Sequence, residues 1–79
     1  MAADDSHTLD LRGLKCPLPV LRARKALERM TPRDVLVVEC TDPMAAIDIP
    51  HFVTEAGHRL EGQVTAGDVL VFHIRKAAQ

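Results

Sequence analysis

The chain is poor in aromatic residues, since its 79 residues include no tryptophan, no tyrosine and only two phenylalanines. A domain of this length buries roughly 60 % of the surface that its unfolded chain exposes. Hydrophobic residues still make up 47 % of the sequence, so the core must be aliphatic. The shortage of rings argues against a deep aromatic-lined cofactor pocket and against a platform for stacking nucleic-acid bases. We therefore expect one small domain with no cofactor, no substrate pocket and no direct nucleic-acid contact.

A strong net charge, a long apolar run and a metal-binding pattern are also lacking. The formal net charge is −1, which gives no overall attraction to nucleic acid. No apolar run approaches the ~20 residues of a membrane span or resembles a secretory signal, so we expect no membrane association. Cys16 and Cys40 have neither the CxxC spacing of a zinc or redox site nor the number needed for a disulfide framework. With the four histidines scattered, we expect no metal site and a reducing compartment, the cytoplasm.

The hydrophobic pattern predicts a single domain over residues 8–76, between a disordered segment 1–7 and a short tail 77–79. Residues 1–7 are small, polar or acidic and show no periodicity, as is typical of a frayed terminus. No internal repeat or low-complexity segment interrupts the rest of the chain. The sequence therefore predicts one folding unit.

Local patterns predict four strands and two helical segments. Alternating apolar and polar residues are typical of half-buried strands, and apolar residues three and four apart are typical of an amphipathic helix. The expected strands are 8–12, 35–38, 59–65 and 69–75, and the expected first helix is 20–30. The largely β-branched run 35–38 should lie centrally in the sheet or be covered on both faces.

The second helical segment contains Pro50, which lacks an N–H and clashes with the preceding turn of a regular helix. We therefore expect a short turn over 43–47 and a helical restart after it. Asp42 and Asp48 are expected to cap the turn and the restart rather than to act as a catalytic acid pair, because aspartate accepts hydrogen bonds from free N–H groups at helix starts. Gly57 should follow the helix end in a left-handed conformation.

The element order is thus β-α-β-α-β-β, which predicts an α+β fold. It would be a two-layer α/β sandwich with a mixed four-stranded sheet. The first and third expected strands each have a solvent-exposed face, which implies that both helices pack on one face of the sheet. The order of the strands within the sheet stays open.

Cys16 stands at the entrance to the first helix, directly before Pro17-Leu18-Pro19. Pro17 suits the first helical position and holds the residue before it in an extended geometry. We therefore expect Cys16 to be the N-cap, with its sulfur accepting the Leu18 N–H. The positive end of the helix dipole and the neighbouring Lys15 should lower the pKa of the thiol. The alternative is a small buried cysteine that closes the loop.

The segment LDLRGLKCPLPV, residues 9–20, closely resembles the signature of the TusA-like (SirA-like) sulfur-carrier family, whose core is a Cys-Pro-x-Pro element after a short strand. Segments 41–50, 56–58 and 72–76 are also similar to that family. Cys-Pro-x-Pro alone would be a weak signal. The four segments in this order span nearly the whole chain, and the set is specific.

The resemblance implies a carrier that holds sulfane sulfur as a persulfide on Cys16 and hands it to an acceptor protein. Gly13, Pro17 and Pro19 would shape the loop, and the donor would be a cysteine desulfurase or a rhodanese-like protein. Family members serve tRNA thiolation, molybdenum-cofactor work and sulfur oxidation, and the sequence does not say which. The expected activity is that of a monomeric, sulfurtransferase-type carrier rather than an enzyme with a substrate pocket.

Basic residues recur on one face of the first expected helix, at Arg22, Lys25 and Arg29. Such a stripe is by default a solvated helix face. It nevertheless lies on the helix that follows Cys16, where charge could steer an acidic partner surface. Lys15, Arg22 and Lys25 are therefore candidates for partner docking.

Two other functions stay open. One is a redox protein that uses Cys16 and Cys40 as a dithiol, because the carboxyl ends of two parallel strands meet at the same sheet edge. The other is a nonenzymatic regulatory module in which Cys16 is structural. A persulfide donor should add one sulfur atom to a carrier, remove two hydrogens from a dithiol, and leave a regulatory module unchanged.

Overall fold

In the computed structural model, the described residues are 6–78. Their elements are β1 (Ser6–Leu11), α1 (Leu18–Glu28), β2 (Val35–Cys40), α2 (Ala45–Glu55), β3 (Arg59–Ala66) and β4 (Val69–Arg75). This is the expected order β-α-β-α-β-β. The first strand begins two residues earlier than expected, at Ser6, so the expected disordered segment is too long by these two residues. Its remaining part, residues 1–5, and residue 79 of the expected tail lie outside the described residues.

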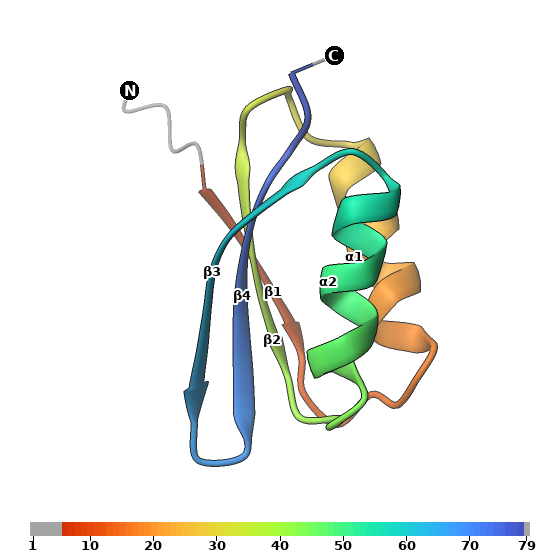
Figure 1. Ribbon diagram of the computed structural model, residues 1–79, viewed down its shortest axis with the longest axis vertical. Coiled ribbons are helices and arrows are strands. Elements are labelled where there is room, and N and C mark those ends of the chain that lie inside the picture. Colours follow the sequence, from red (N-terminus) through yellow and green to blue (C-terminus); the bar gives the residue numbers. More distant parts are fainter. Residues whose placement is uncertain (1–5, 79) are drawn as a thin grey trace.

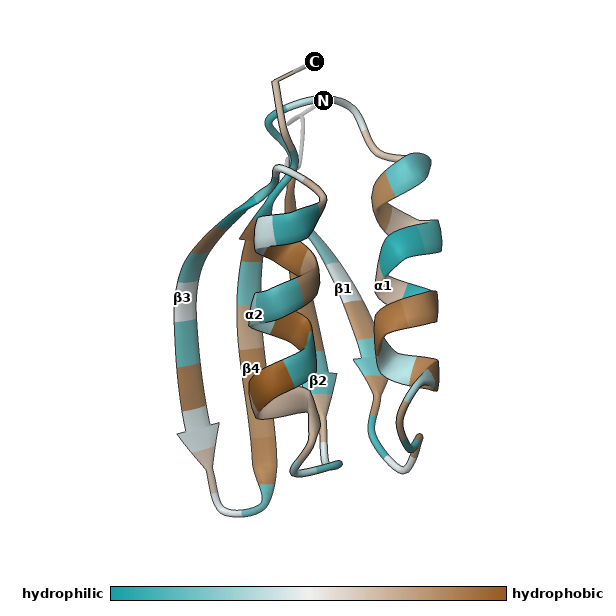
Figure 2. Ribbon diagram, turned by 45° about the vertical axis from the view of Figure 1, so that its right-hand side comes forward, coloured by the Kyte–Doolittle hydropathy of each residue, from teal (hydrophilic) through white to brown (hydrophobic). Residues whose placement is uncertain are grey.

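The four strands form one mixed sheet in the order β1-β2-β4-β3. The β1–β2 pair is parallel, whereas β2–β4 and β3–β4 are antiparallel. Both helices lie on the same face of the sheet (Figures 1 and 2), which confirms the two-layer sandwich. None of the helices within residues 6–78 is long and apolar enough to cross a membrane.

The core lies between the sheet and the helices and is aliphatic apart from the two phenylalanines. On β2 every second side chain is buried, and the alternate ones are half-buried. The strand is therefore central, as expected, but it is not covered on both faces. The buried set is Leu11, Ala23, Leu27, Met30, Leu36, Val38, Cys40, Ala45, Ile49, Phe52, Val53, Phe72 and Ile74.

The α2 helix runs without a break through Pro50, so the expected turn and restart are wrong. A proline inside a helix removes one ladder hydrogen bond. Burial of Ile49, Phe52 and Val53 around it holds the helix against the sheet on both sides of the proline. The helix ends as expected, because Gly57 has a φ of +82°. The bonds from the Gly57 N–H to the Thr54 carbonyl and from the His58 N–H to the Val53 carbonyl form a Schellman motif.

The parallel β1–β2 pair determines where the functional loops meet. Leu11 and Cys40, the last residues of these strands, are register partners, so the two following loops leave the sheet at the same edge. Gly13 turns the first loop with a φ of +85°, and its N–H donates to Oγ1 of Thr41 in the second loop at 2.8 Å. This pairing brings the Cys16 segment beside the start of α2.

Candidate functional site

Cys16 lies one residue further from α1 than expected. The N-cap of α1 is Pro17, which makes no side-chain cap bond, and Pro19 is the second helical residue. The Leu18 N–H donates to the Lys15 carbonyl at 2.8 Å, so it is not available to the Cys16 sulfur. The prediction that Cys16 caps the helix is therefore wrong. The thiol is exposed, which also excludes the alternative of a cysteine buried in the loop.

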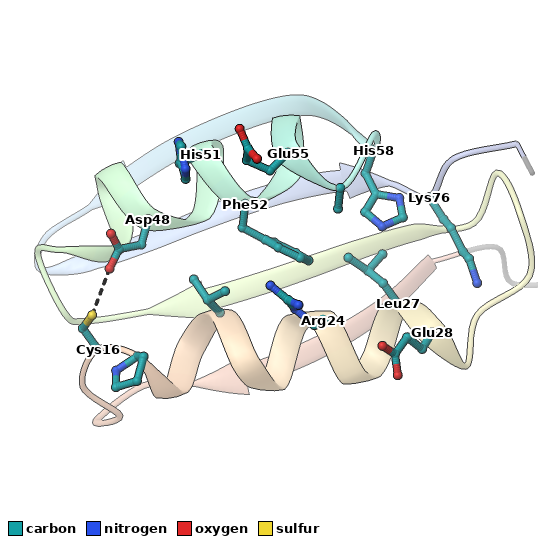
Figure 3. A pocket seen from close by; sticks show the side chains of 13 residues that line it. Cys16, Arg24, Leu27, Glu28, Asp48, His51, Phe52, Glu55, His58 and Lys76 are labelled. Atoms are coloured by element: carbon teal, nitrogen blue, oxygen red, sulfur yellow. Dashed lines mark hydrogen bonds between the residues drawn. The ribbon is translucent and has the colours of Figure 1, made fainter.

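Two carboxylates from the α2 segment hold Cys16. Its N–H donates to Oδ2 of Asp42 at 2.6 Å, and its thiol donates to Oδ2 of Asp48 at 3.0 Å (Figure 3). The second oxygen of Asp42 accepts the Met44 N–H at 3.1 Å. The Ala45 N–H also donates to the Asp42 carbonyl, so Asp42 caps the turn that leads into α2, as predicted. Asp48 lies inside the first turn of α2, so the prediction that it caps a helical restart is wrong. Both carboxylates also accept bonds from the cysteine loop, which brings its own donors within reach.

These carboxylates reverse the expected electrostatics of Cys16. The pKa of its thiol is raised, first by the hydrogen bond to Asp48, then by desolvation and by the negative charges of Asp48 and Asp42. The expectation of a lowered pKa rested on the helix dipole and Lys15, whose influence falls off within a turn and through solvent. A carboxylate in direct contact with the sulfur outweighs both. In the isolated protein Cys16 is therefore held as a thiol.

Cys40 differs from Cys16 chiefly in its burial. It ends β2 with no exposed surface, and burial, followed by the charge of Asp42, raises the pKa of its thiol to about 11. Both cysteines are free. Because the thiolate is the nucleophile, Cys40 is a poor nucleophile at neutral pH, and of the two thiols only Cys16 is accessible.

An open groove of about 940 Å³ runs between α1 and α2 from Cys16 towards Lys76 (Figure 3). The expectation of a surface without a pocket is therefore wrong. That expectation rested on the lack of aromatic residues. Two helices that lie side by side on a sheet leave a groove between them even when few of the side chains are aromatic. The apolar lining includes Val20, Leu27 and Phe52.

The sequence analysis missed Arg24, which lines this groove and lies with its guanidinium carbon 5.3 Å from the centroid of the Phe52 ring. Such a cation–π contact holds the side chain over the ring. Helical spacing gave a usable signal, since Arg24 follows Val20 by four residues and precedes Leu27 by three. Arg22 and Lys25, the residues chosen for docking, are exposed on α1 like Lys15 before it.

At the far end of the groove, the ring of His58 is hydrogen-bonded to the segment that follows β4. Its Nδ1 accepts the Ala77 N–H at 2.9 Å. Burial, followed by the charge of Lys76, lowers the pKa of the ring. His58 is therefore neutral at neutral pH and adds no positive charge to the groove. Within residues 6–78, no group of three or more histidine, cysteine or acidic side chains is placed to hold a metal ion.

Comparisons with known proteins agree with this geometry. The family model described as "Sulfurtransferase TusA" matches residues 7–76. Two relatives from Neisseria meningitidis, of serogroups A and B, are each named a "putative sulfur carrier protein". Both are 54 % identical over 56 residues, which cover 71 % of this chain and 76 % of the relative. The crystal structure of a SirA-like protein from Desulfitobacterium hafniense superposes with a TM-score of 0.77 at 26 % identity, covering 89 % of this chain and 96 % of that one.

Replacing Asp48 by asparagine is expected to lower the pKa of the Cys16 thiol, because the change removes the negative charge beside the sulfur and leaves an amide that can donate to a thiolate. Alkylation of Cys16 by iodoacetamide at neutral pH should become severalfold faster, with the modified peptide identified by mass. Asp68→Asn, in the exposed β3–β4 turn, is the matched control and should leave the rate unchanged. Identical pH–rate profiles for Asp48→Asn and the unmodified protein would contradict the assignment.

Proposed function

The chain belongs to the TusA sulfurtransferase family, and we propose on this premise that it is a sulfur carrier whose Cys16 holds sulfane sulfur as a persulfide. The observation that carries the proposal is the exposed Cys16 thiol, which lies in the Cys-Pro-x-Pro element at the mouth of a groove. Gly13 and Pro17 shape the loop around it, and Pro19 packs into the protein as a buried residue of α1.

Loading is an exchange between a thiol and a persulfide. The Cys16 sulfur attacks the outer sulfur of the donor persulfide, and its proton passes to the Asp48 carboxylate or to water. A bond from Sγ to that sulfur forms, the S–S bond of the donor breaks, and the electron pair leaves with the donor sulfur as a thiolate. The sulfane sulfur changes carrier, and no external oxidant or reductant is needed.

Unloading repeats the same exchange in the opposite sense. A thiolate of the acceptor protein attacks the terminal sulfur of the Cys16 persulfide, and the Sγ–S bond breaks. Cys16 leaves as a thiolate, which takes up a proton and returns to its hydrogen bond with Asp48. The carrier therefore ends the cycle in the state in which it began.

The two alternative functions have less support. A dithiol redox protein needs a second reactive cysteine, and Cys40 is fully buried with its pKa raised to about 11. A regulatory module in which Cys16 is structural would give that thiol a packing role, whereas it is exposed. Both observations favour the carrier.

The proposed partners follow from the chemistry. We propose that a cysteine desulfurase or a rhodanese-like protein loads the carrier, which works as a monomer in the reducing cytoplasm, and that a protein cysteine unloads it. The acceptor determines the pathway, whether tRNA thiolation, molybdenum-cofactor synthesis or sulfur oxidation. Lys15, Arg22 and Lys25 are proposed to steer these encounters.

Cys16→Ser is expected to abolish sulfur loading and to leave the fold intact, because the side chain is exposed and serine lacks sulfur nucleophilicity. Cys40→Ala should load normally, since alanine keeps that buried position apolar. The measurement is the intact mass after incubation with a persulfide donor, which should rise by one sulfur atom. Loading that survives in Cys16→Ser, or a loss of two hydrogens in the unmodified protein, would overturn the proposal.

Charge reversal on α1, by Arg22→Glu or Lys25→Glu, is expected to slow sulfur transfer from a cysteine desulfurase severalfold at low salt. Charges at the rim of an interface act mainly on the association rate and are screened by salt. Reaction with a small persulfide should be unchanged. Arg59→Glu, on exposed β3, changes the net charge equally and serves as the control. If all three variants behave alike, the basic residues are an ordinary solvated face.

A further inference from the structure

Exposed apolar side chains stand at the starts of both helices, close in the chain to Cys16 or to Asp48. Five large hydrophobic residues are exposed among residues 6–78, and only Val64 of these lies on the sheet. The other four belong to the first turns of the helices or their caps. We call them the apolar rim: Leu18, Leu21, Met44 and Ile47.

The apolar rim has two halves, one on each helix. Leu18 and Leu21 are three residues apart on α1 and so share a face, as do Met44 and Ile47 at the start of α2. Both helices begin at the same end of the molecule (Figure 2). Leu18 follows Cys16 by two residues and Ile47 precedes Asp48, which accepts the Cys16 thiol, so each half lies within a few residues of the site. Ile47 is 64 % exposed and Leu21 51 %, so the described part of the chain leaves both largely uncovered.

The centre of this surface is negative. Asp42 and Asp48 accept bonds from the N–H and the thiol of Cys16, so a thiolate or persulfide anion there would be a third negative charge. A cation brought by another molecule would offset this repulsion. A second copy of this chain would instead add two more carboxylates, which disfavours a symmetric dimer through the same surface.

We propose that the apolar rim and the two carboxylates form the docking surface for the sulfur-transfer partner, a protein whose own cysteine is flanked by apolar side chains and a lysine or arginine. The inference rests on the proposed function. Sulfur passes only when two sulfur atoms touch, so the surface that surrounds Cys16 must be covered by the partner during transfer. A patch of four aliphatic side chains suits a transient contact rather than a permanent one.

This surface gives the carrier selectivity for proteins over small thiols. The hydrogen bond to Asp48 raises the pKa of the Cys16 thiol and so disfavours the thiolate in the free protein. A docked cation beside Asp48 favours the thiolate, so the nucleophile forms when the correct partner is present. The apolar contacts keep the partner in place while the sulfur moves.

Synthetic peptides with one cysteine test this inference. Cys16 is loaded with inorganic polysulfide, and transfer of its outer sulfur is timed to peptides that flank the cysteine with Leu and Arg, Ser and Arg, or Leu and Glu. Each rate is divided by that of the same peptide with cysteine persulfide, so that intrinsic thiol reactivity cancels. The Leu and Arg peptide should be favoured over each of the others by about tenfold, which corresponds to about 1.4 kcal/mol.

Variants assign each preference to its residues. The double variant Leu21→Ser, Ile47→Ser should no longer prefer the peptide with Leu to the peptide with Ser. Asp48→Asn should no longer prefer the peptide with Arg to the peptide with Glu. The matched control is Val64→Ser, which removes an exposed apolar side chain from β3 and should keep both preferences. Equal initial loading confirms that Cys16 carries sulfur in every variant, and matching circular dichroism spectra confirm that each variant is folded.

Three results would overturn the inference. The first is equal normalised rates for the three peptides. The second is a response of Val64→Ser as large as that of the double variant. The third is a dimer of the unmodified protein, measured by light scattering, that the double variant converts to monomers, because the rim would then be covered by a second copy. Failure of Cys16 to load at all would instead refute the proposed function.

Discussion

Cys16 donates two hydrogen bonds to carboxylates of the α2 segment, and the rest of the site depends on them. Asp42 accepts its backbone N–H and Asp48 accepts its thiol, so the α2 segment positions the reactive atom and sets its protonation. Both bonds depend on the parallel pairing of β1 and β2, because the loops that follow these strands leave the sheet at one edge. The bond from the Gly13 N–H to Thr41 fixes the same two loops together. The thiol therefore owes its state to the sheet topology rather than to the helix it precedes.

Local signals in the sequence were enough to predict the helices and strands but not the contacts between them. The bounds of the strand 69–75 and the left-handed conformation of Gly57 were predicted correctly. Both depend on a few neighbouring residues, through the alternation of apolar and polar side chains in a strand and through the signal that ends a helix. The partner of the Cys16 thiol is 32 residues away, and the strand order that brings it close was left open. The predicted direction of the Cys16 pKa shift was wrong for the same reason, because it considered the nearest helix and not the carboxylate of Asp48, which is distant in the chain. The cap assigned to Asp48 was wrong because α2 runs through Pro50 without a restart, whereas Asp42 caps the turn before α2 as predicted.

A raised thiol pKa is consistent with the work of a carrier. A permanently ionised, exposed cysteine would exchange with any small disulfide or electrophile that it met. A thiol bonded to Asp48 would instead stay protonated until a partner changes its surroundings. We propose that the groove between the helices and the apolar rim are the surface on which that change occurs. Cys40, buried at the end of β2, packs as a small apolar residue.

The most direct test of the central claim follows one sulfur atom through the protein. A cysteine desulfurase is supplied with cysteine carrying an isotopically heavy sulfur, the loaded carrier is separated, and an unlabelled acceptor protein is then added. Peptide mass mapping at each stage should find the heavy atom on the peptide that contains Cys16 and then, as the acceptor is added, on a cysteine of the acceptor. Heavy sulfur on the Cys40 peptide, or a Cys16 label that no acceptor protein removes, would contradict the account.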